Sequence, residues 1–156
     1  MQECTVITPL GFARIAGNET GIAEISVLDK GKVSEKVPKV LQRAVKQLDD
    51  YFQGKRTSFD FKINPKGTEF QKKVWRELCA IPFGKTMSYL ELSKKLGDVK
   101  AIRAVASANA KNPIWIVVPC HRVIGSDGSL VGYAGGQYRK KWLLEHENPH
   151  KQQTLF

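Results

Sequence analysis

The stretch Ile114–Val123 reads IWIVVPCHRV and joins a short apolar run to a cysteine–histidine pair. The run Ile114–Val118 is rich in β-branched residues and ends at Pro119, which is typical of a buried strand. Proline fixes its own φ and holds the residue before it in extended backbone. We therefore expect Cys120 at the end of a buried strand, beside a histidine that can lower the pKa of its thiol.

Length and charge limit the class of protein. The chain has 156 residues, a formal net charge of +10 and a pI near 9.6. This length suffices for one compact unit or two small subdomains. The charge favours a polyanionic partner, and a generally basic protein without such a partner is the alternative.

The three cysteines are odd in number and form no C-x-x-C pattern. This usage predicts neither a disulfide framework nor a zinc ribbon. The sequence opens with no signal peptide and contains no apolar run long enough to span a bilayer. We therefore expect a cytoplasmic protein in a reducing compartment.

The N-terminal part alternates apolar segments with turn residues, which predicts an antiparallel sheet. Its three expected strands are Thr5–Ile7, Gly11–Ile15 and Ile22–Val27. A helical pattern follows Pro38 and stops at Gly54. Its apolar face comprises Leu41, Ala44, Val45, Leu48 and Phe52.

The polar connector 57–66 marks a boundary, and we predict three parts for the chain. Residues 1–63 form a small sheet-bearing subdomain, and residues 64–148 form a mainly helical domain. Residues 149–156 form a flexible tail. The fold class is therefore mixed α/β.

A helix begins after the connector, because Thr68 and Gln71 form a capping-box pattern. Cys79 adjoins the apolar stripe of this helix, so we expect it to be a buried, inert thiol. The stripe consists of Phe70, Val74 and Leu78.

A second capping box, Ser88 with Glu91, opens a short helix that ends at Gly97, and another helix covers residues 100–110. Two short helices joined by a glycine-containing turn are the outline of a helix-turn-helix, although many helical hairpins bind nothing. One face of the second helix is expected to point inward, with Ile102, Val105, Ala106 and Asn109. The opposite face carries Arg103, Ser107 and Ala110, which suits close contact with another molecule or simply a solvated arginine.

Several motifs lie around the cysteine in a fixed order. They are Ser88-Tyr89, Arg103–Val105, Asn112-Pro113, Pro119–Val123, Gly132–Gly136 and Trp142–Glu147. Together they resemble the O6-alkylguanine-DNA alkyltransferases, most closely the free-standing bacterial type. The resemblance is dense from Asn64 to Glu147. It implies direct-reversal DNA repair, in which an alkyl group passes irreversibly from guanine O6 to Cys120, and it leaves open O4-alkylthymine as a further substrate.

The resemblance also implies how Cys120 is activated. A water relays the cysteine proton to His121, and Glu147 orients the imidazole. The residues support the last role independently, because Glu147 lies four positions after Leu143 on the apolar face of a helix, where an acid needs a partner. The alternative is a helix-end glutamate in solvent. His146 is expected to be structural or exposed.

Other roles follow from the resemblance alone. Tyr89 donates a hydrogen bond to the guanine ring and crowds the 3′ phosphate, and Arg103 replaces the extruded nucleotide in the duplex. Asn112 ties the recognition helices to the active-site strand. The carbonyls of Cys120 and Val123 accept hydrogen bonds from the guanine amino group.

The loop Gly132–Gly136 matches the pocket loop of the family, with Tyr133 as its aromatic wall and Gly135 allowing close approach of the backbone. Many members carry a serine where this chain has Ala134, so only the amide remains to meet O6. Arg122 is expected to brace the fold. Some family members carry a zinc in the N-terminal part, but here that part holds only Cys4 and no histidine, so we expect no metal and no cofactor.

The implied partner is double-stranded DNA containing O6-alkylguanine, bound through the minor groove by a monomer that extrudes the damaged nucleotide. The sequence ends in QQTLF, and Gln152, Leu155 and Phe156 resemble the short peptide by which bacterial repair proteins bind the sliding clamp. A tail without a partner is the alternative.

Two rivals to the repair function remain. One is a lesion-binding module, although alkyltransferase-like proteins lack the cysteine. The other is a cysteine hydrolase that uses Cys120, His121 and Glu147.

Overall fold

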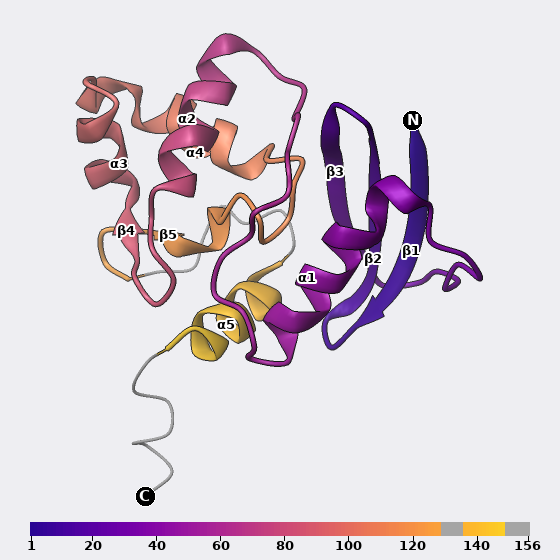
Figure 1. The fold of residues 1–156 in the computed structure, drawn as a ribbon. Helices are drawn as coiled ribbons and strands as arrows, with labels where there is room; N and C mark the ends of the chain where they lie inside the picture. Colours follow the sequence, from indigo (N-terminus) through magenta and orange to yellow (C-terminus); the bar gives the residue numbers. More distant parts are fainter. Residues whose placement is uncertain (129–135, 149–156) are drawn as a thin grey trace, which may run out of the picture. The chain divides into compact units, whose positions relative to one another are not determined.

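The computed structural model describes residues 1–128 and 136–148. They form two compact units, which Figure 1 shows in the colours of the sequence. The first unit contains Met1–Lys66 and Pro113–Val117, and the second begins at Gly67, runs to Asn112 and resumes at Val118. The predicted mixed α/β class is confirmed, with an antiparallel three-stranded sheet in the first unit and most helices in the second.

The sheet of the first unit contains β1 (Gln2–Thr8), β2 (Gly11–Asn18) and β3 (Gly21–Leu28) in sequence order. The three predicted strands are thus confirmed. Ile15 lies opposite Cys4 on one side and Ile25 on the other, and all three side chains are buried. Alternate residues of these strands therefore supply one layer of the core.

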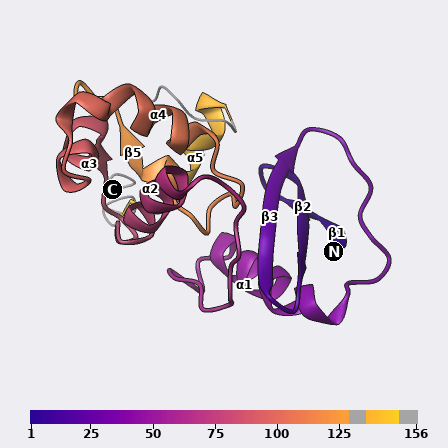
Figure 2. The ribbon, with the colours of Figure 1, turned by 90° about the horizontal axis from the view of Figure 1, so that it is seen from above.

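A short 3-10 turn, η1 (Lys39–Leu41), leads into α1 (Gln42–Phe52), which lies across the sheet in Figures 1 and 2. The buried residues of this layer include Leu41, Ala44, Leu48 and Tyr51. The predicted helix is confirmed, and Gly54 follows it with a φ of 77°. Such a φ favours glycine and ends the helix.

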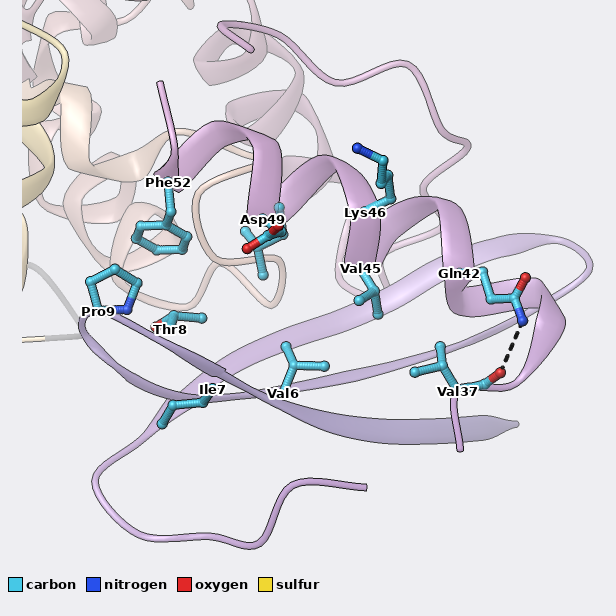
Figure 3. Close-up of a pocket in the computed structure, with 11 residues that line it drawn as sticks. Val6, Ile7, Thr8, Pro9, Val37, Gln42, Val45, Lys46, Asp49 and Phe52 are labelled. Carbon is cyan, nitrogen blue, oxygen red and sulfur yellow. Dashed lines mark hydrogen bonds between the residues drawn. The ribbon is translucent and has the colours of Figure 1, made fainter. Parts of the chain in front are cut away.

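A pocket of about 330 Å³ opens between β1 and α1 (Figure 3). Its walls are mainly apolar, with Val6 and Ile7 from the strand and Val45 and Phe52 from the helix. At one end, Gln42 Nε2 donates a hydrogen bond of 3.3 Å to the carbonyl of Val37. None of the predicted active-site residues that the structure describes lines this pocket.

The prediction that Ile114–Val118 forms a strand is wrong, although most of the segment is buried. Only a bridge to Ile25 forms: Ile25 N donates to Pro113 O and Trp115 N donates to Ile25 O, each at 2.9 Å. Two tight turns follow, with Val117 N bonded to Trp115 O and Cys120 N bonded to Val118 O, each at 2.8 Å. The first turn holds Ile116 at a φ of 70°.

The physical reason is that β-branched composition reports burial rather than extended backbone in this segment. Ile114, Ile116 and Val118 are all buried. The chain passes from the first unit to the second between Val117 and Val118, and hydrogen bonds between residues i and i+2 reverse its direction there.

The second unit is mainly helical, with one short two-stranded sheet. Its helices are α2 (Glu69–Cys79), α3 (Tyr89–Lys95), α4 (Ile102–Ala110) and α5 (Gln137–His146), with the 3-10 turns η2 (Val99–Ala101) and η3 (Cys120–Arg122). The strands β4 (Met87–Ser88) and β5 (Val123–Ile124) are parallel. This pairing holds the beginning of α3 beside the segment that follows Cys120.

Both predicted capping boxes are confirmed. The side chains of Thr68 and Ser88 accept hydrogen bonds from the backbone N–H groups of Gln71 and Glu91. In turn, the side chains of Gln71 and Glu91 accept from the backbone N–H groups of Thr68 and Ser88. The prediction that Phe70 of α2 is buried is wrong. Phe70 is 39% exposed, whereas Trp75 is buried and its Nε1 donates to Ala108 O at 2.9 Å.

Cys79 is exposed rather than buried, because it lies beside the apolar stripe of α2 instead of in it. No helix among the described residues is long and apolar enough to cross a membrane.

Candidate active site

Cys120 is the first residue of η3 and is 5% exposed. The 3-10 turn replaces the extended backbone in which consecutive side chains would point to opposite sides. Asn112 holds this turn from the end of α4, since its Nδ2 lies 2.7 Å from Val118 O and 3.3 Å from Cys120 Sγ. Asn112 thus links the helix to the cysteine segment, as the resemblance implies.

Burial raises the pKa of Cys120 to about 11, although the hydrogen bond from Asn112 and the nearby Lys140 each act to lower it. The group is therefore a neutral thiol at neutral pH. A thiol attacks efficiently only as a thiolate, so the reaction requires a base that takes its proton.

His121 and Glu147 form a buried pair, with 2.8 Å between Nε2 and Oε2. Arg122 binds the same carboxylate, with Nε 2.8 Å from Oε1 and Nη2 3.0 Å from Oε2. Its Nη1 donates to the carbonyl of Ile81 at 2.7 Å. Glu147 is thus held by His121 and Arg122, among others, which agrees with the prediction that an acid on the apolar face of the helix needs a partner, and Arg122 braces the site.

The charges of this cluster follow from its hydrogen bonds. Burial acts to raise the pKa of Glu147, but the hydrogen bonds from His121 and Arg122 outweigh it and lower the pKa to about 2. Burial lowers the pKa of His121, against the opposing effect of Glu147. At neutral pH the pair is therefore a carboxylate and a neutral imidazole.

This charge state determines which nitrogen of the His121 imidazole carries the hydrogen. A carboxylate only accepts, so Nε2 of His121 carries the hydrogen and donates it to Glu147. The other nitrogen, Nδ1, then has a lone pair. It is buried and has no hydrogen-bond partner among the described residues. His121 can therefore act as a base through Nδ1.

Tyr89 begins α3 directly after its cap, Ser88, and is 7% exposed. Its hydroxyl oxygen lies 3.2 Å from Nδ2 of Asn109, which also lies 3.4 Å from the carbonyl oxygen of Cys120. Burial raises the pKa of Tyr89, and the bond from Asn109 opposes this shift. At neutral pH Tyr89 is thus a phenol that retains its proton.

Lys140 is fully buried, and its Nζ lies 2.5 Å from the carbonyl oxygen of Val123 and 5.9 Å from the centre of the Tyr89 ring. Burial lowers its pKa to about 8. The sequence pattern did not indicate this residue, because Lys140-Lys141 is typical of a solvated surface. One signal was present: Lys140 lies three and seven residues before Leu143 and Glu147, hence on the same helix face.

The remaining predicted site residues fall into three groups: those on α4, Val123, and the loop residues. Arg103 and Ser107 are exposed on α4 and Ala110 is half-buried, whereas Val105 and Asn109 of the same helix are buried. Val123 is buried directly after the cysteine turn. Tyr133, Ala134 and Gly135 lie outside the described residues.

His146 is half-buried and stacks on Trp142, with 5.0 Å between ring centres, which supports a structural role. Within residues 1–128 and 136–148, no group of three or more histidine, cysteine, aspartate or glutamate side chains could hold a metal ion.

A buried cysteine followed in the chain by a neutral imidazole that a carboxylate holds is typical of proteins that use a cysteine nucleophile. Residues 69–149 match the DNA-binding domain of 6-O-methylguanine DNA methyltransferase, and residues 3–65 match the ribonuclease-like domain named for the same enzyme. The chain belongs to the 6-O-methylguanine DNA methyltransferase family, which confirms the resemblance seen in the sequence.

Curated relatives agree over nearly the whole chain. A methylated-DNA–protein-cysteine methyltransferase of Methanosarcina barkeri is 48% identical over 147 residues, covering 90% of this chain and 92% of the relative. A protein of the same name from Mycolicibacterium paratuberculosis is 42% identical over 156 residues, covering 97% and 94%.

Solved structures show the same fold. The OGT protein of Mycobacterium tuberculosis, crystallised in complex with DNA, has a TM-score of 0.86 and 39% identity, with 100% of each chain covered. An O6-methylguanine DNA methyltransferase from Methanococcus jannaschii has a TM-score of 0.69 and 28% identity, with 93% of each chain covered.

Proposed function

We propose that this protein repairs DNA directly, by moving an alkyl group from guanine O6 to the sulfur of Cys120 once per molecule. The observation that carries the proposal is the buried Cys120 followed by His121, whose imidazole is held as a neutral base by Glu147. Membership of the methyltransferase family supports the same reaction.

The reaction transfers one alkyl group and moves one proton. The thiol proton leaves Cys120 toward Nδ1 of His121, and the sulfur attacks the alkyl carbon. The S–C bond forms while the C–O6 bond breaks, and the electron pair stays on guanine as an anion. The base then takes up one proton and becomes normal guanine, which balances the proton that the thiol gave to His121. Because a thioether is stable, the cysteine is not regenerated. The chemistry uses protein side chains alone and calls for no cofactor.

Side chains around the cysteine suit the departing base. Tyr89 keeps its proton at neutral pH and can donate it toward the guanine ring. Asn112 fixes the cysteine turn, and the carbonyl of Val123, to which Lys140 donates, follows that turn. We assign the rest of the pocket to Tyr133, Ala134 and Gly135 on the family resemblance alone.

The proposed partner is duplex DNA with an O6-alkylguanine, whose nucleotide must leave the stack to reach a buried thiol. We assign DNA contact to α3 and α4 as a helix-turn-helix. Arg103 would enter the duplex, and Ser107 and Ala110 would allow close approach. The exposure of Arg103 and Ser107 and the net charge of +10 support this assignment. Catalysis and DNA binding then both belong to residues 64–148.

Three finer assignments complete the proposal. The protein acts as a monomer that accepts one alkyl group, and it works in the cytoplasm, a location that its three free thiols support. Gln152, Leu155 and Phe156, which lie outside the described residues, bind a sliding clamp.

Intact-protein mass spectrometry tests the reaction. After incubation with a duplex containing O6-methylguanine, the protein should gain the mass of one methyl group, located on Cys120, in a burst that stops at one repair per molecule. Cys120→Ala should abolish the gain yet still bind the alkylated duplex, and Cys79→Ala should behave as the wild type. Repeated turnover would favour the hydrolase, and methyl on Cys79 would refute the proposed nucleophile.

A further inference from the structure

Asn109 is a fully buried polar residue on α4, the helix whose opposite face carries Arg103. Its Nδ2 lies 3.2 Å from the hydroxyl oxygen of Tyr89 and 3.4 Å from the carbonyl oxygen of Cys120. The proposed DNA contacts of α4 involve only the outer face and do not explain this inward amide.

The amide is poorly satisfied for its degree of burial. Asn109 Oδ1 is buried and has no hydrogen-bond partner among the described residues. A buried acceptor without a partner costs free energy, whereas an apolar side chain would fill the same site without that cost. An asparagine therefore has to contribute something here that an apolar residue cannot.

The two contacts fix which end of the amide faces the site. A backbone carbonyl only accepts, so the group that faces Cys120 O must be the N–H₂ end. The same nitrogen faces Tyr89, and an N–H₂ group only donates. The phenol oxygen therefore accepts from Asn109, and the O–H of Tyr89 must point away from it.

We propose that Asn109 is a positioning residue of this active site, which sets the hydroxyl of Tyr89 as a hydrogen-bond donor toward the departing base. The role rests on the proposed alkyl transfer. Asn109 touches no substrate; it acts through Tyr89. The carbonyl of Cys120 serves as the anchor that keeps the amide in the donating orientation.

The test is a double-mutant cycle between Asn109→Ala and Tyr89→Phe, read as the single-turnover rate of alkyl transfer from free O6-benzylguanine. A free base avoids any effect of α4 on duplex binding. In the wild-type background, loss of the Asn109 bond should slow transfer roughly three- to tenfold. In the Tyr89→Phe background the same substitution should change the rate less than about twofold, because no hydroxyl is left to orient.

A pH profile separates positioning from support of the fold. The bond from Asn109 opposes the rise in the pKa of Tyr89, so its loss should move the decline in rate that follows Tyr89 ionisation to higher pH. Lys111→Ala, at an exposed position after α4, is the matched control and should leave rate and profile unchanged. If Asn109→Ala does not fold, Asn109→Leu fills the space and should give the same result.

Equal rate losses in both backgrounds, or an unchanged rate in Asn109→Ala, would overturn the positioning role while leaving alkyl transfer intact. Absence of any transfer to wild-type protein from either O6-benzylguanine or O6-methylguanine duplex would overturn the proposed function, and this inference with it.

Discussion

Glu147 sits between a neutral imidazole and a guanidinium, and its carboxylate is 2% exposed. The positive charge of Arg122 offsets its negative charge. The neutral imidazole of His121 is oriented by the hydrogen bond to this carboxylate. A carboxylate in this position keeps the imidazole in one tautomer, as the hydrogen bond to Nε2 requires. The same residue thus serves both the fold and the proposed proton transfer.

Glu147→Gln should separate these two contributions. At neutral pH the substitution leaves Arg122 buried without its countercharge, so the free energy of unfolding should fall by about 3–5 kcal/mol. In the wild type the pKa of Glu147 falls from 4.5 to about 2, so its stabilisation is complete above pH 4.5 and is lost as the pH falls toward 2. The stability difference between the two proteins, measured by urea unfolding, should therefore shrink from pH 7 to pH 3.

Glu145→Gln is the control for this prediction, because Glu145 is exposed on the same helix. It should leave both stability and single-turnover rate near those of the wild type. Glu147→Gln should also slow alkyl transfer and raise the apparent pKa of Cys120 in the rate profile, since His121 loses its orienting partner. A pH-rate profile that matches the wild type would leave Glu147 with a structural role alone.

The sequence predicted Cys120, His121 and Glu147 because they belong to short motifs with a recognisable order. It did not predict that Asn109 and Lys140 reach the same site. Their contacts, with Tyr89 and Val123, join segments 17 to 20 residues apart. Local spacing carries no information about such contacts, and a lysine next to another lysine gives a surface pattern.

At the scale of elements, the start of α3 matters because its first residue is Tyr89. Ser88 accepts a 3.0 Å hydrogen bond from Glu91 N, and Glu91 Oε1 accepts one of 3.2 Å from Ser88 N. Ser88→Ala removes the first of these bonds and should lower the free energy of unfolding by about 1 kcal/mol. Ser88→Thr keeps the acceptor and should restore most of it. Equal unfolding midpoints for the wild type and Ser88→Ala would show that the cap contributes nothing.

The next prediction concerns the outer face of α4 and the repair of duplex DNA. Arg103 is exposed on that face, and its proposed role applies only when a nucleotide has to leave a duplex. Arg103→Ala should therefore slow repair of O6-methylguanine in duplex DNA by at least about tenfold, in line with the cost of unstacking a base. Its reaction with free O6-benzylguanine should stay close to that of the wild type.

Arg76→Ala provides the charge-matched control. Arg76 is exposed near the end of α2, and no contact with the extruded nucleotide is proposed for it. It tests whether loss of any one positive charge weakens repair. Similar losses on both substrates in Arg103→Ala would mean that the arginine supports the fold of α4 instead of the extrusion of the base.

Capping and periodicity predicted the sheet, α1 and the starts of α2 and α3, because these signals are local. The run Ile114–Val118 failed as a strand since its β-branched residues are buried in tight turns, one of them around Ile116. Phe70 failed as a core residue because the buried face of α2 is rotated toward Trp75, which is buried with Val74 and Leu78 and donates to Ala108 O. Both errors concern which neighbours a segment meets, and the sequence alone does not specify them.

At the scale of the whole molecule, every described residue of the candidate site lies in the second unit, while the first unit holds the three-stranded sheet. A net charge of +10 further suits a protein that first binds undamaged DNA through its phosphates and then reaches a lesion. Lesions are rare among normal base pairs. Attachment to a protein that already tracks along DNA would therefore raise the chance of encounter.

The C-terminal sequence QQTLF predicts such an attachment. A few large side chains in a pocket can supply most of the affinity of a short peptide, so Leu155 and Phe156 would anchor the tail and Gln152 would add a polar contact. A tether to the clamp would then raise the effective concentration of the repair domain near DNA. Deleting residues 152–156 should abolish binding to purified sliding clamp in a titration, yet leave repair of a short duplex unchanged.

Substitutions within the tail sharpen this last test. Leu155→Ala with Phe156→Ala should weaken clamp binding as much as the deletion does, because the anchors are lost. Gln153→Ala with Thr154→Ala should retain binding, since neither residue belongs to the resemblance. Slower repair of a short duplex by the deletion variant would contradict a tail that acts only through the clamp. If the full-length protein shows no clamp binding, the match of QQTLF to the clamp peptide is a coincidence.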